Sequence, residues 1–560
     1  MTVPAPRLLL SVLIAAQLAA CSSGIPGAAP APVAEPAMAE RLNAAPTVQP
    51  LSPPALAPAA AMAQGAAAKE TRMAVMPSPV PAPMPAADQP SNERYGQISD
   101  NPVHRVAEAP VSTFSVDVDT GSYSNVRRML NSGALPPADA VRVEELINYF
   151  PYDYALPRDD RPFAVHTALA PAPWNAQRVL LRVAIKGQDV AKQALPPANL
   201  VFLVDVSGSM ESADKLPLLK SSLKLMVDEM RPVDRISLVT YAGGTQVVLP
   251  PTSGSDKATI KSAIDGLRAG GSTAGASGIA LAYHAAKDSF IPNGINRILL
   301  ATDGDFNVGV SDTEQLKKMV EQQRRSGISL STLGFGTGNY NEAMMEQIAD
   351  VGDGAYSYVD NLMEGHKVLV SEMTSTLATI AKDVKVQIEF NPALVQEYRQ
   401  IGYENRQLRR EDFHNDQVDA GDIGAGHTVT ALYELTLTGA RGAIDPLRYG
   451  GAATVAAGDA HTDELAHLRL RYKLPGHSAS ELMETPIRRA ALRPLDQTDA
   501  EFRFATAVAG FGQKLRGGRY TGGWSYADAR ALAAGSVGTD RFGYRGEFLR
   551  MVDLAQALGK

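Results

Sequence analysis

The sequence predicts an α/β protein: a doubly wound, mainly parallel sheet flanked by an antiparallel β-sandwich or α+β region, after a disordered amino-terminal tether. Three observations support this fold class. In the middle of the chain, apolar runs that suit buried strands alternate with amphipathic segments that suit helices, as in a parallel sheet covered on both faces. Runs before and after that stretch alternate apolar with polar residues, as strands with one solvated face do. The amino-terminal part is dominated by Ala and Pro and cannot form a core.

The chain begins with the layout of a secretory signal peptide. Arg7 precedes the apolar stretch 8–16, and two alanines stand directly before Cys21, the only cysteine. The apolar stretch is shorter than the ~20 residues that a spanning helix needs. The segment resembles a bacterial lipoprotein signal, which implies acylation of Cys21 and a lipid anchor in the cell envelope. By the same resemblance, Ser22 favours the outer membrane, facing the periplasm. The alternative is a plain signal peptide with an incidental cysteine.

The predicted tether covers residues 21–101, after the signal peptide at 1–20. It has too few aromatic and β-branched residues to offset the entropy of its chain. About 75 residues of this kind span roughly 50 Å as a loose coil. We therefore expect the folded part to reach away from a membrane surface while it stays anchored there.

A first folded segment is expected over 102–193. Its expected elements are a strand at 114–118, a helix at 122–130, a second helix opened by Pro137, and strands at 163–165 and 179–185. The last two strands have the alternating character of strands that come much later in the chain. We therefore expect them to pair with those later strands.

The middle segment, 197–377, carries the parallel sheet. Strands are expected at 199–205, 236–241, 246–250, 297–302, 328–335 and 355–359. Helices are expected at 215–230, 256–267, 277–289, 313–326, 341–350 and 362–377. In a doubly wound fold the ligand site lies at the carboxyl ends of the strands.

The last segment, 379–560, has a different pattern. Strict alternation predicts antiparallel strands at 384–390, 428–435 and 466–472, and helices follow at about 498–516, 525–534 and 545–558. We expect a β-sandwich with helices, built together with the strands that precede the middle segment.

Polar side chains gather where two of the predicted parallel strands end. Asp205, Ser207 and Ser209 follow the first strand, and Asp303 follows the strand at 297–302. Thr273 lies in a Gly-rich loop above the same edge. Because the carboxyl ends of parallel strands meet at one edge, we expect these oxygens to converge.

The chemistry of this set favours a hard divalent cation. Two carboxylates about 4 Å apart repel each other by about 4 kcal/mol at an effective dielectric constant of 20, and a cation removes that repulsion. Carboxylate and hydroxyl oxygens suit Mg²⁺, with Ca²⁺ or Mn²⁺ as alternatives. Zinc is disfavoured because the set contains neither His nor Cys.

The set resembles the metal-ion-dependent adhesion site of a von Willebrand factor A (vWA) domain, a Rossmann-like fold. That pattern is Asp-x-Ser-x-Ser with a distant Thr and a distant Asp, and all five positions match. The resemblance implies that Ser207, Ser209 and, with a partner bound, Thr273 contact the metal directly. Asp205 and Asp303 then act through water, and one position stays open for a carboxylate from a partner protein or peptide.

The segments on either side strengthen the resemblance. The sequence at 114–123 and the sequence at 142–150 are similar to the amino-terminal region of bacterial YfbK-like vWA lipoproteins. The part after the middle segment resembles the domain of unknown function that follows vWA in that family. The resemblance implies metal-dependent binding of an acidic partner at the cell envelope, without enzymatic activity.

Two further sets of acids have plainer interpretations. Asp305 is either a supporting carboxylate or an exposed loop acid, and the second is favoured. Asp117 and Asp119 could belong to a metal cluster, but Asp and Gly in this stretch favour a turn.

Three other classes of function receive less support. Ser212 and Lys215 match the Ser-x-x-Lys pattern of serine-type hydrolases, but the companion motifs are missing. Lys and Arg are scattered and the formal net charge is −7, so nucleic acid is not an expected partner. A scaffold whose metal only braces loops remains the main alternative to a binding protein.

Overall fold

The fold is taken from a computed structural model. It describes residues 93–272, 275–304, 313–338, 340–445 and 461–559. The chain divides into two units, 1–84 and 85–560, and the described residues all belong to the second. The predicted signal peptide, Cys21 and the tether up to residue 92 lie outside the described residues. Along the described part of the chain, none of the helices has the length and apolar character to cross a membrane.

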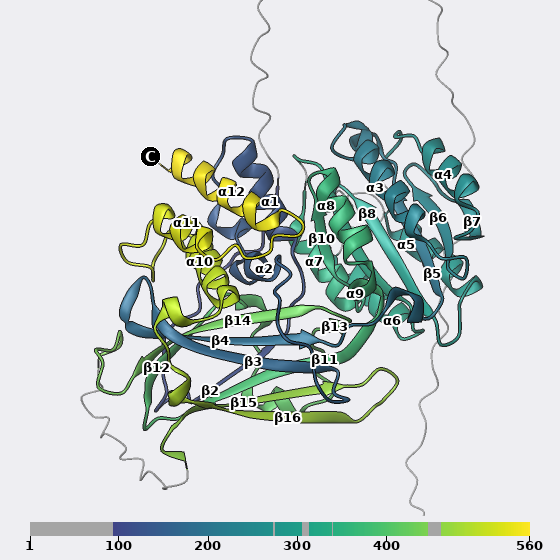
Figure 1. Ribbon diagram of the computed structural model, residues 1–560. Coiled ribbons are helices and arrows are strands. Elements are labelled where there is room, and N and C mark those ends of the chain that lie inside the picture. Colours follow the sequence, from purple (N-terminus) through teal and green to yellow (C-terminus); the bar gives the residue numbers. More distant parts are fainter. Residues whose placement is uncertain (1–92, 273–274, 305–312, 339, 446–460, 560) are drawn as a thin grey trace, which may run out of the picture. The chain divides into compact units, whose positions relative to one another are not determined.

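The central unit is a six-stranded sheet in the order β10-β9-β8-β5-β6-β7 (Figure 1). Neighbouring strands are parallel except for the antiparallel β6–β7 pair at one edge. The strands are β5 (Ala198–Asp205), β6 (Arg235–Tyr241), β7 (Thr245–Ser253), β8 (Ile295–Thr302), β9 (Ser329–Phe335) and β10 (Tyr356–Val359). This topology confirms the predicted doubly wound, mainly parallel sheet.

Helices cover both faces of this sheet. They are α3 (Leu216–Glu229), α4 (Lys257–Gly266), α5 (Gly275–Asp288), α6 (Thr313–Arg324), α7 (Glu342–Val351), α8 (Leu362–His366) and α9 (Met373–Leu377). On β5, Phe202 packs into the core under α3 and α4, whereas the next residue, Leu203, packs into the core under α5 and α7. The strand is therefore buried on both faces, as its continuous apolar sequence requires.

The segment expected as one helix at 362–377 is broken. A π-helical turn, Lys367–Ser371, separates α8 from α9. Such single-turn π segments are rare and interrupt the regular helical spacing. The apolar pattern alone predicts helix here but not this interruption.

The flanking region contains two packed antiparallel sheets. One has the order β1-β12-β14-β4-β3, and in the other β11 pairs with β13, β15 and β2, while β16 pairs with β15. The strands are β1 (His104–Arg105), β2 (Val111–Ser115), β3 (Phe163–Ala172), β4 (Asn175–Gly187), β11 (Thr379–Phe390), β12 (Val395–Ile401), β13 (Ile423–Gly424), β14 (Thr428–Leu437), β15 (Glu464–Lys473) and β16 (Ser480–Arg488). Val183 of β4 and Val386 of β11 belong to the same buried core.

Strands from before and after the central unit pair with each other. Residues 179–186 of β4 pair with 428–435 of β14, and β2 pairs with β11. The predicted pairing with later strands is therefore confirmed for 179–185, whereas 163–165 belongs to β3, which pairs with β4 and joins the same sheet through it. β12 and β16 were not predicted.

Helices from both flanks share a further core. They are α1 (Gly121–Asn131), α2 (Val143–Asn148), α10 (Ala500–Leu515), α11 (Tyr526–Ala534) and α12 (Tyr544–Leu558). Phe150, Phe504 and Phe548 make edge contacts with one another in this core. The segments 102–193 and 379–560 thus form one packed region around the central unit.

Several predicted boundaries differ from the structure: the strand expected at 114–118 lies at 111–115, and the strand expected at 163–165 extends over 163–172. Pro137 precedes a short 3₁₀ turn rather than a long helix, because Arg142 is extended and its N–H donates to Ser122 Oγ at 2.9 Å. The folded part also begins before residue 102, the expected end of the tether, because Arg94 pairs with the central unit and its N–H donates to Tyr340 O at 2.8 Å.

Candidate metal centre

The candidate centre lies at the carboxyl ends of β5 and β8, which are parallel neighbours. Asp205 is the last residue of β5, and Asp303 follows the last residue of β8. Both side chains are buried, with relative exposures of 0% and 1%. The structure therefore brings these two predicted ligands to the same edge of the sheet.

Asp205 is held by a dense set of donors. Its Oδ1 accepts the N–H of Ser207 at 2.9 Å, and its Oδ2 accepts the hydroxyls of Thr302 at 2.9 Å and Tyr241 at 3.2 Å. Burial, together with the charge of Asp303, raises the pKa of Asp205, while the hydrogen bonds from Ser207 and Thr302 oppose that rise. The carboxylate is fixed in place and carries an electrostatic cost that a cation would relieve.

The two serines point their hydroxyls at each other. Ser207 Oγ and Ser209 Oγ are 3.0 Å apart. Ser207 is buried, while Ser209 is exposed in the short 3₁₀ turn Gly208–Glu211. The pair thus connects the buried floor of the site to its open side.

The Gly-rich loop is tied to this turn by its backbone. Gly208 N–H donates to Gly271 O at 3.1 Å, and Gly270 N–H donates to Val206 O at 2.7 Å. Gly271 has a φ of +89°, which favours glycine. Thr273 lies outside the described residues, and so does Asp305, so their predicted roles stay predictions.

A lysine that no metal-binding pattern indicates also contacts the site. Lys215 Nζ lies 2.9 Å from Asp303 Oδ2, and both side chains are buried. The lysine stem packs on Gly336, where an added Cβ would lie 2.2 Å from Lys215 Cε. A signal was available: Lys215 caps the start of α3, where the helix dipole disfavours a positive charge, so it needs a carboxylate partner.

The same geometry weakens the hydrolase interpretation. Ser212 Oγ donates to Asp214 Oδ1 at 2.5 Å, while the ammonium group of Lys215 contacts Asp303 instead of Ser212. Within the described residues, Ser212 and Lys215 therefore do not form a nucleophile–base pair.

The donor set fits a hard cation. Across the described residues, no three His, Cys, Asp or Glu side chains are grouped so that they could hold a metal ion. A metal centre at this edge would thus depend on two carboxylates and on serine hydroxyls. These are oxygen ligands, which Mg²⁺ prefers. Asp205, Ser207 and Ser209 offer oxygens of this kind, and Asp303 shares its charge with Lys215.

A second acidic region lies where α7 meets the flanking region; we call it the seam. Its charged members are Asp117, Asp119, Arg142, Glu144, Glu145, Glu342, Glu346, Asp350, Glu404 and Arg406. The Asp119 N–H donates to Asp117 Oδ1 at 3.1 Å, a local turn contact of the kind expected from the sequence. Arg406 lies 3.2 Å from Asp117 Oδ2 and 3.0 Å from Asp119 Oδ2.

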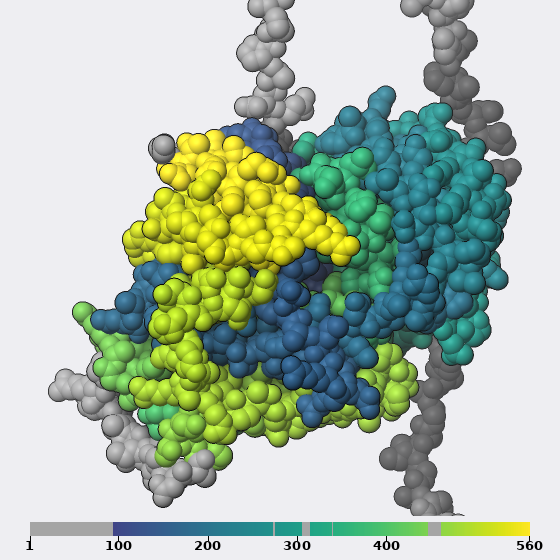
Figure 2. Space-filling view, in the orientation of Figure 1, coloured from purple at the N-terminus to yellow at the C-terminus, as the bar shows by residue number. Residues whose placement is uncertain are grey.

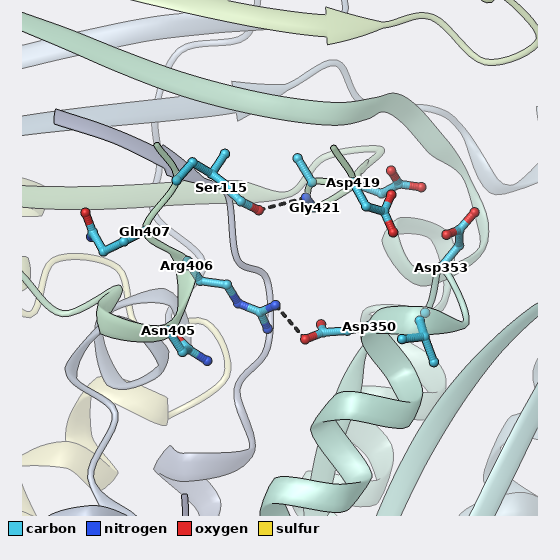
Figure 3. Close-up of a pocket in the computed structure, with 13 residues that line it drawn as sticks. Ser115, Asp350, Asp353, Asn405, Arg406, Gln407, Asp419 and Gly421 are labelled. Carbon is cyan, nitrogen blue, oxygen red and sulfur yellow. Dashed lines mark hydrogen bonds and ion pairs between the residues drawn. The ribbon is translucent and has the colours of Figure 1, made fainter. Parts of the chain in front are cut away.

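The seam borders an open cavity of about 240 Å³ (Figure 3). Arg406 points into it from one side and contacts Asp350 at 2.7 Å, while Asp353 and Asp419 stand on the other side. Because Arg406 and Arg324 contact three of the four carboxylates that line it, this region differs in kind from the edge at Asp205.

Family models match three stretches of the chain. The von Willebrand factor type A domain model matches residues 199–371, a von Willebrand factor model matches 89–182, and the model of the carboxyl-terminal part of the uncharacterized protein YfbK matches 375–558. Together these matches extend over both flanks and the central unit.

Individual proteins and a solved structure are also similar to this chain. The chain is 54% identical to the uncharacterized protein YfbK of Escherichia coli (strain K12) over 84% of its own length and 82% of that protein. It is 30% identical to inter-alpha-trypsin inhibitor heavy chain H3 of Rattus norvegicus, over 28% of this chain and 19% of that one. A solved structure, von Willebrand factor type A from Catenulispora acidiphila, covers 72% of this chain and 99% of its own, at 17% identity and a TM-score of 0.41.

The identity to YfbK spans most of both chains, and the three family models match the central unit and the regions before and after it. The chain therefore belongs to the YfbK family, with a von Willebrand factor type A domain at its centre.

Proposed function

We propose that this protein binds an acidic segment of a partner protein or peptide through a divalent cation at the edge of the vWA sheet. The proposed metal-binding residues are Asp205, Ser207, Ser209, Thr273 and Asp303. Mg²⁺ is the proposed ion, with Ca²⁺ or Mn²⁺ as alternatives. The protein acts as a binding protein in this proposal and not as an enzyme.

One observation carries the proposal. The exposed Ser209 hydroxyl lies 3.0 Å from the buried Ser207 hydroxyl, beside a buried and fully hydrogen-bonded Asp205. Neutral hydroxyls face the open side and the charge lies beneath them. A bound Mg²⁺ supplies a positive charge with room for one more oxygen ligand.

The charges of the chain's own residues suit this use. Asp205 and Asp303 bring two negative charges, and Lys215 returns one positive charge. The edge then attracts a divalent cation, and the loaded edge carries a net positive charge that attracts a carboxylate. Because the proposed direct ligands of the metal are neutral hydroxyls, they cancel little of its positive charge.

The test is affinity capture from membranes with the full chain, in Mg²⁺ and again in EDTA. We expect Ser209→Ala to lose the captured partner and EDTA to release it from the wild type. Ser212→Ala is the matched control: Ser212 is exposed next to the same turn, and its hydroxyl donates to Asp214 in the described structure. Capture that survives both EDTA and Ser209→Ala would sink the proposal.

A scaffold role is the competing function, and one observation favours it. Lys215 already neutralises Asp303 without a metal, so the loops at this edge have an internal cation to brace them. A scaffold predicts partners that are indifferent to Ser209→Ala, although the variant still folds.

We also propose that the protein is lipid-anchored through Cys21, in the outer-membrane arrangement that the signal resemblance implies. Several acyl chains anchor a protein firmly, at about 0.8 kcal/mol per buried CH₂ group. Cys21→Ser is expected to move the protein from the membrane fraction to the soluble fraction, as followed by fractionation and immunoblotting. A variant that stays with the membrane contradicts the anchor.

A further inference from the structure

A second cavity lies away from the metal edge, where the end of the vWA domain meets both flanks. Its volume is about 310 Å³, within the range of small-molecule sites. It is lined from β4, from the π-helical turn and α9, and from the start of α12. Figure 2 shows the surface hollowed where the yellow carboxyl-terminal region comes against its neighbours.

One side of this cavity is basic. Lys367 is buried, at 1% exposure, and its ammonium group lies 4.3 Å from the ring centre of Tyr149 and 2.8 Å from Glu372 Oε1. Lys186 Nζ donates to Gly426 O at 2.7 Å. An ammonium group has three donors and no acceptor, so each lysine keeps donors beyond these contacts.

His427 lines the same cavity as the two lysines. Burial and the positive charges of Lys367 and Lys186 lower the pKa of His427 to about 4, so the ring is neutral near pH 7. Among the described residues its Nδ1 has no hydrogen-bond partner. The ring therefore adds an unused polar group to the same wall.

The acids of the cavity do not use up these donors. Glu372 is paired with Lys367, and Asp189 is the other carboxylate in the lining. Two lysines and a histidine thus offer more donors than the two carboxylates occupy. A group with several hydrogen-bond acceptors, such as a carboxylate or a phosphate, can accept hydrogen bonds from the remaining donors.

Aromatic side chains also line the cavity. Tyr149 and Phe150 contribute from the end of α2, and Phe542 and Tyr544 contribute from the start of α12. The rings of Phe542 and Tyr544 stack with centroids 5.5 Å apart. Phe542 is 40% exposed, unlike most large apolar side chains of the described chain, and so is available to a ligand.

We propose that this cavity binds a small molecule with an aromatic ring and one anionic group, a carboxylate or a phosphate. The anionic group meets Lys186, Lys367 and His427, and the ring packs against Phe542 and Tyr544. Since Lys367 belongs to the end of the vWA domain and Lys186 to the sandwich, an occupant fastens the two together. The site is independent of the metal edge.

The test is calorimetric titration of the full chain with benzoate and with phenyl phosphate, alongside inorganic phosphate and benzylamine. We expect binding of one or both ring-bearing anions, weaker binding of inorganic phosphate and none of benzylamine. Lys186→Met and Lys367→Met are each expected to weaken the binding at least tenfold. Lys382→Met, a lysine outside this cavity lining, is the control and keeps wild-type affinity.

Several results would overturn the proposal. They are the absence of binding by both ring-bearing anions at millimolar concentration, equal binding of inorganic phosphate, binding of benzylamine, or unchanged affinity in Lys186→Met. Should Lys367→Met fail to fold, Lys186→Met decides, since its ammonium group contacts only a backbone carbonyl within hydrogen-bond distance in the described structure. The Mg²⁺-dependent melting of these variants separates this site from the metal edge.

Discussion

The metal edge and the seam both crowd carboxylates into a poorly solvated place, but they balance the charge differently. In the seam, Arg406 contacts four carboxylates at 2.7–3.4 Å, and Arg142 lies 2.7 Å from Glu346 Oε2. At the metal edge, one lysine contacts one of two carboxylates, and a hydroxyl pair faces outward.

This difference distinguishes a structural joint from the proposed binding site. The arginines of the seam come from the flanks and the acids largely from α7 and α2, so the ion pairs hold separate segments together. Two guanidinium groups serve the eight carboxylates of the seam, and burial raises the pKa of several of these acids, so bound protons offset part of the remaining charge. At the edge, the ammonium group of Lys215 contacts Asp303, and a bound metal would offset the charge that remains on the two carboxylates.

The largest expected effect comes from removing the central cation of the seam. Arg406→Met leaves Asp117, Asp119 and Asp350 without their shared partner, and breaking a buried pair in this way costs about 3–5 kcal/mol. Urea unfolding measures the loss. Arg410→Met, at an exposed neighbour, is the control and stays near wild-type stability. A small loss in Arg406→Met would mean that the seam is not a joint.

The second effect concerns the metal edge. Mg²⁺ at ~100 times its dissociation constant is expected to stabilise the protein by about 2.7 kcal/mol. Asp205→Ala is expected to abolish this gain, whereas Asp214→Asn, on the same turn, keeps it. Melting temperature against Mg²⁺, Ca²⁺ and Mn²⁺ concentration measures both. If none of the three ions shifts the melting temperature, the metal assignment is wrong.

Much of the fold could be predicted from the sequence, because buried faces of helices and strands produce a periodic pattern of apolar residues. All six strands of the central sheet were expected within a few residues, and the alternating runs at 179–185 and 428–435 do pair. β16 was missed because its sequence, Ser480–Arg488, has no regular alternation and much of it is exposed.

The candidate site was only partly predictable, for a different reason. Asp205 and Asp303 follow strands whose order a doubly wound sheet dictates, so their proximity could be expected. The position of Lys215 at the start of α3 indicates that it needs an acidic partner, but not which one, because Asp303 lies 88 positions away and the lysine stem is positioned by packing on Gly336. The seam combines segments even further apart, and its arginines look like surface residues in the sequence.

The third effect is a pH dependence that arises in the seam. Burial and the charge of Glu404 raise the pKa of Glu144 from 4.5 to about 7. Burial and the charge of Glu346 raise the pKa of Glu342 to about 8, although the charge of Arg142 opposes this rise. Between pH 4.5 and 8 the folded state keeps protons that the unfolded state has released, so stability falls as the pH rises. Each tenfold difference in proton affinity between the folded and unfolded states corresponds to about 1.4 kcal/mol.

Urea unfolding at pH 5.5 and at pH 8 checks this dependence. Glu144→Gln, which keeps a neutral group at that position, is expected to lose less stability on going to pH 8 than the wild type. Glu484→Gln, at an exposed position of β16, is the control and keeps the wild-type slope. A wild-type protein that is more stable at pH 8 contradicts the assignment of protons to the seam.

The smallest effect tests whether Lys215 opposes a metal or prepares its site. If its ammonium group competes for Asp303, Lys215→Met is expected to bind Mg²⁺ about fivefold more tightly, worth about 1 kcal/mol. Without metal, the variant is expected to have a lower melting temperature than the wild type, because Asp303 loses its buried partner. Mg²⁺ is therefore expected to stabilise the variant more than the wild type. Lys224→Met, on the same helix and paired with the exposed Asp265, is the control. Weaker Mg²⁺ binding in Lys215→Met would instead show that the lysine positions Asp303. The ion pair at the edge would then have a structural role, as the ion pairs of the seam do.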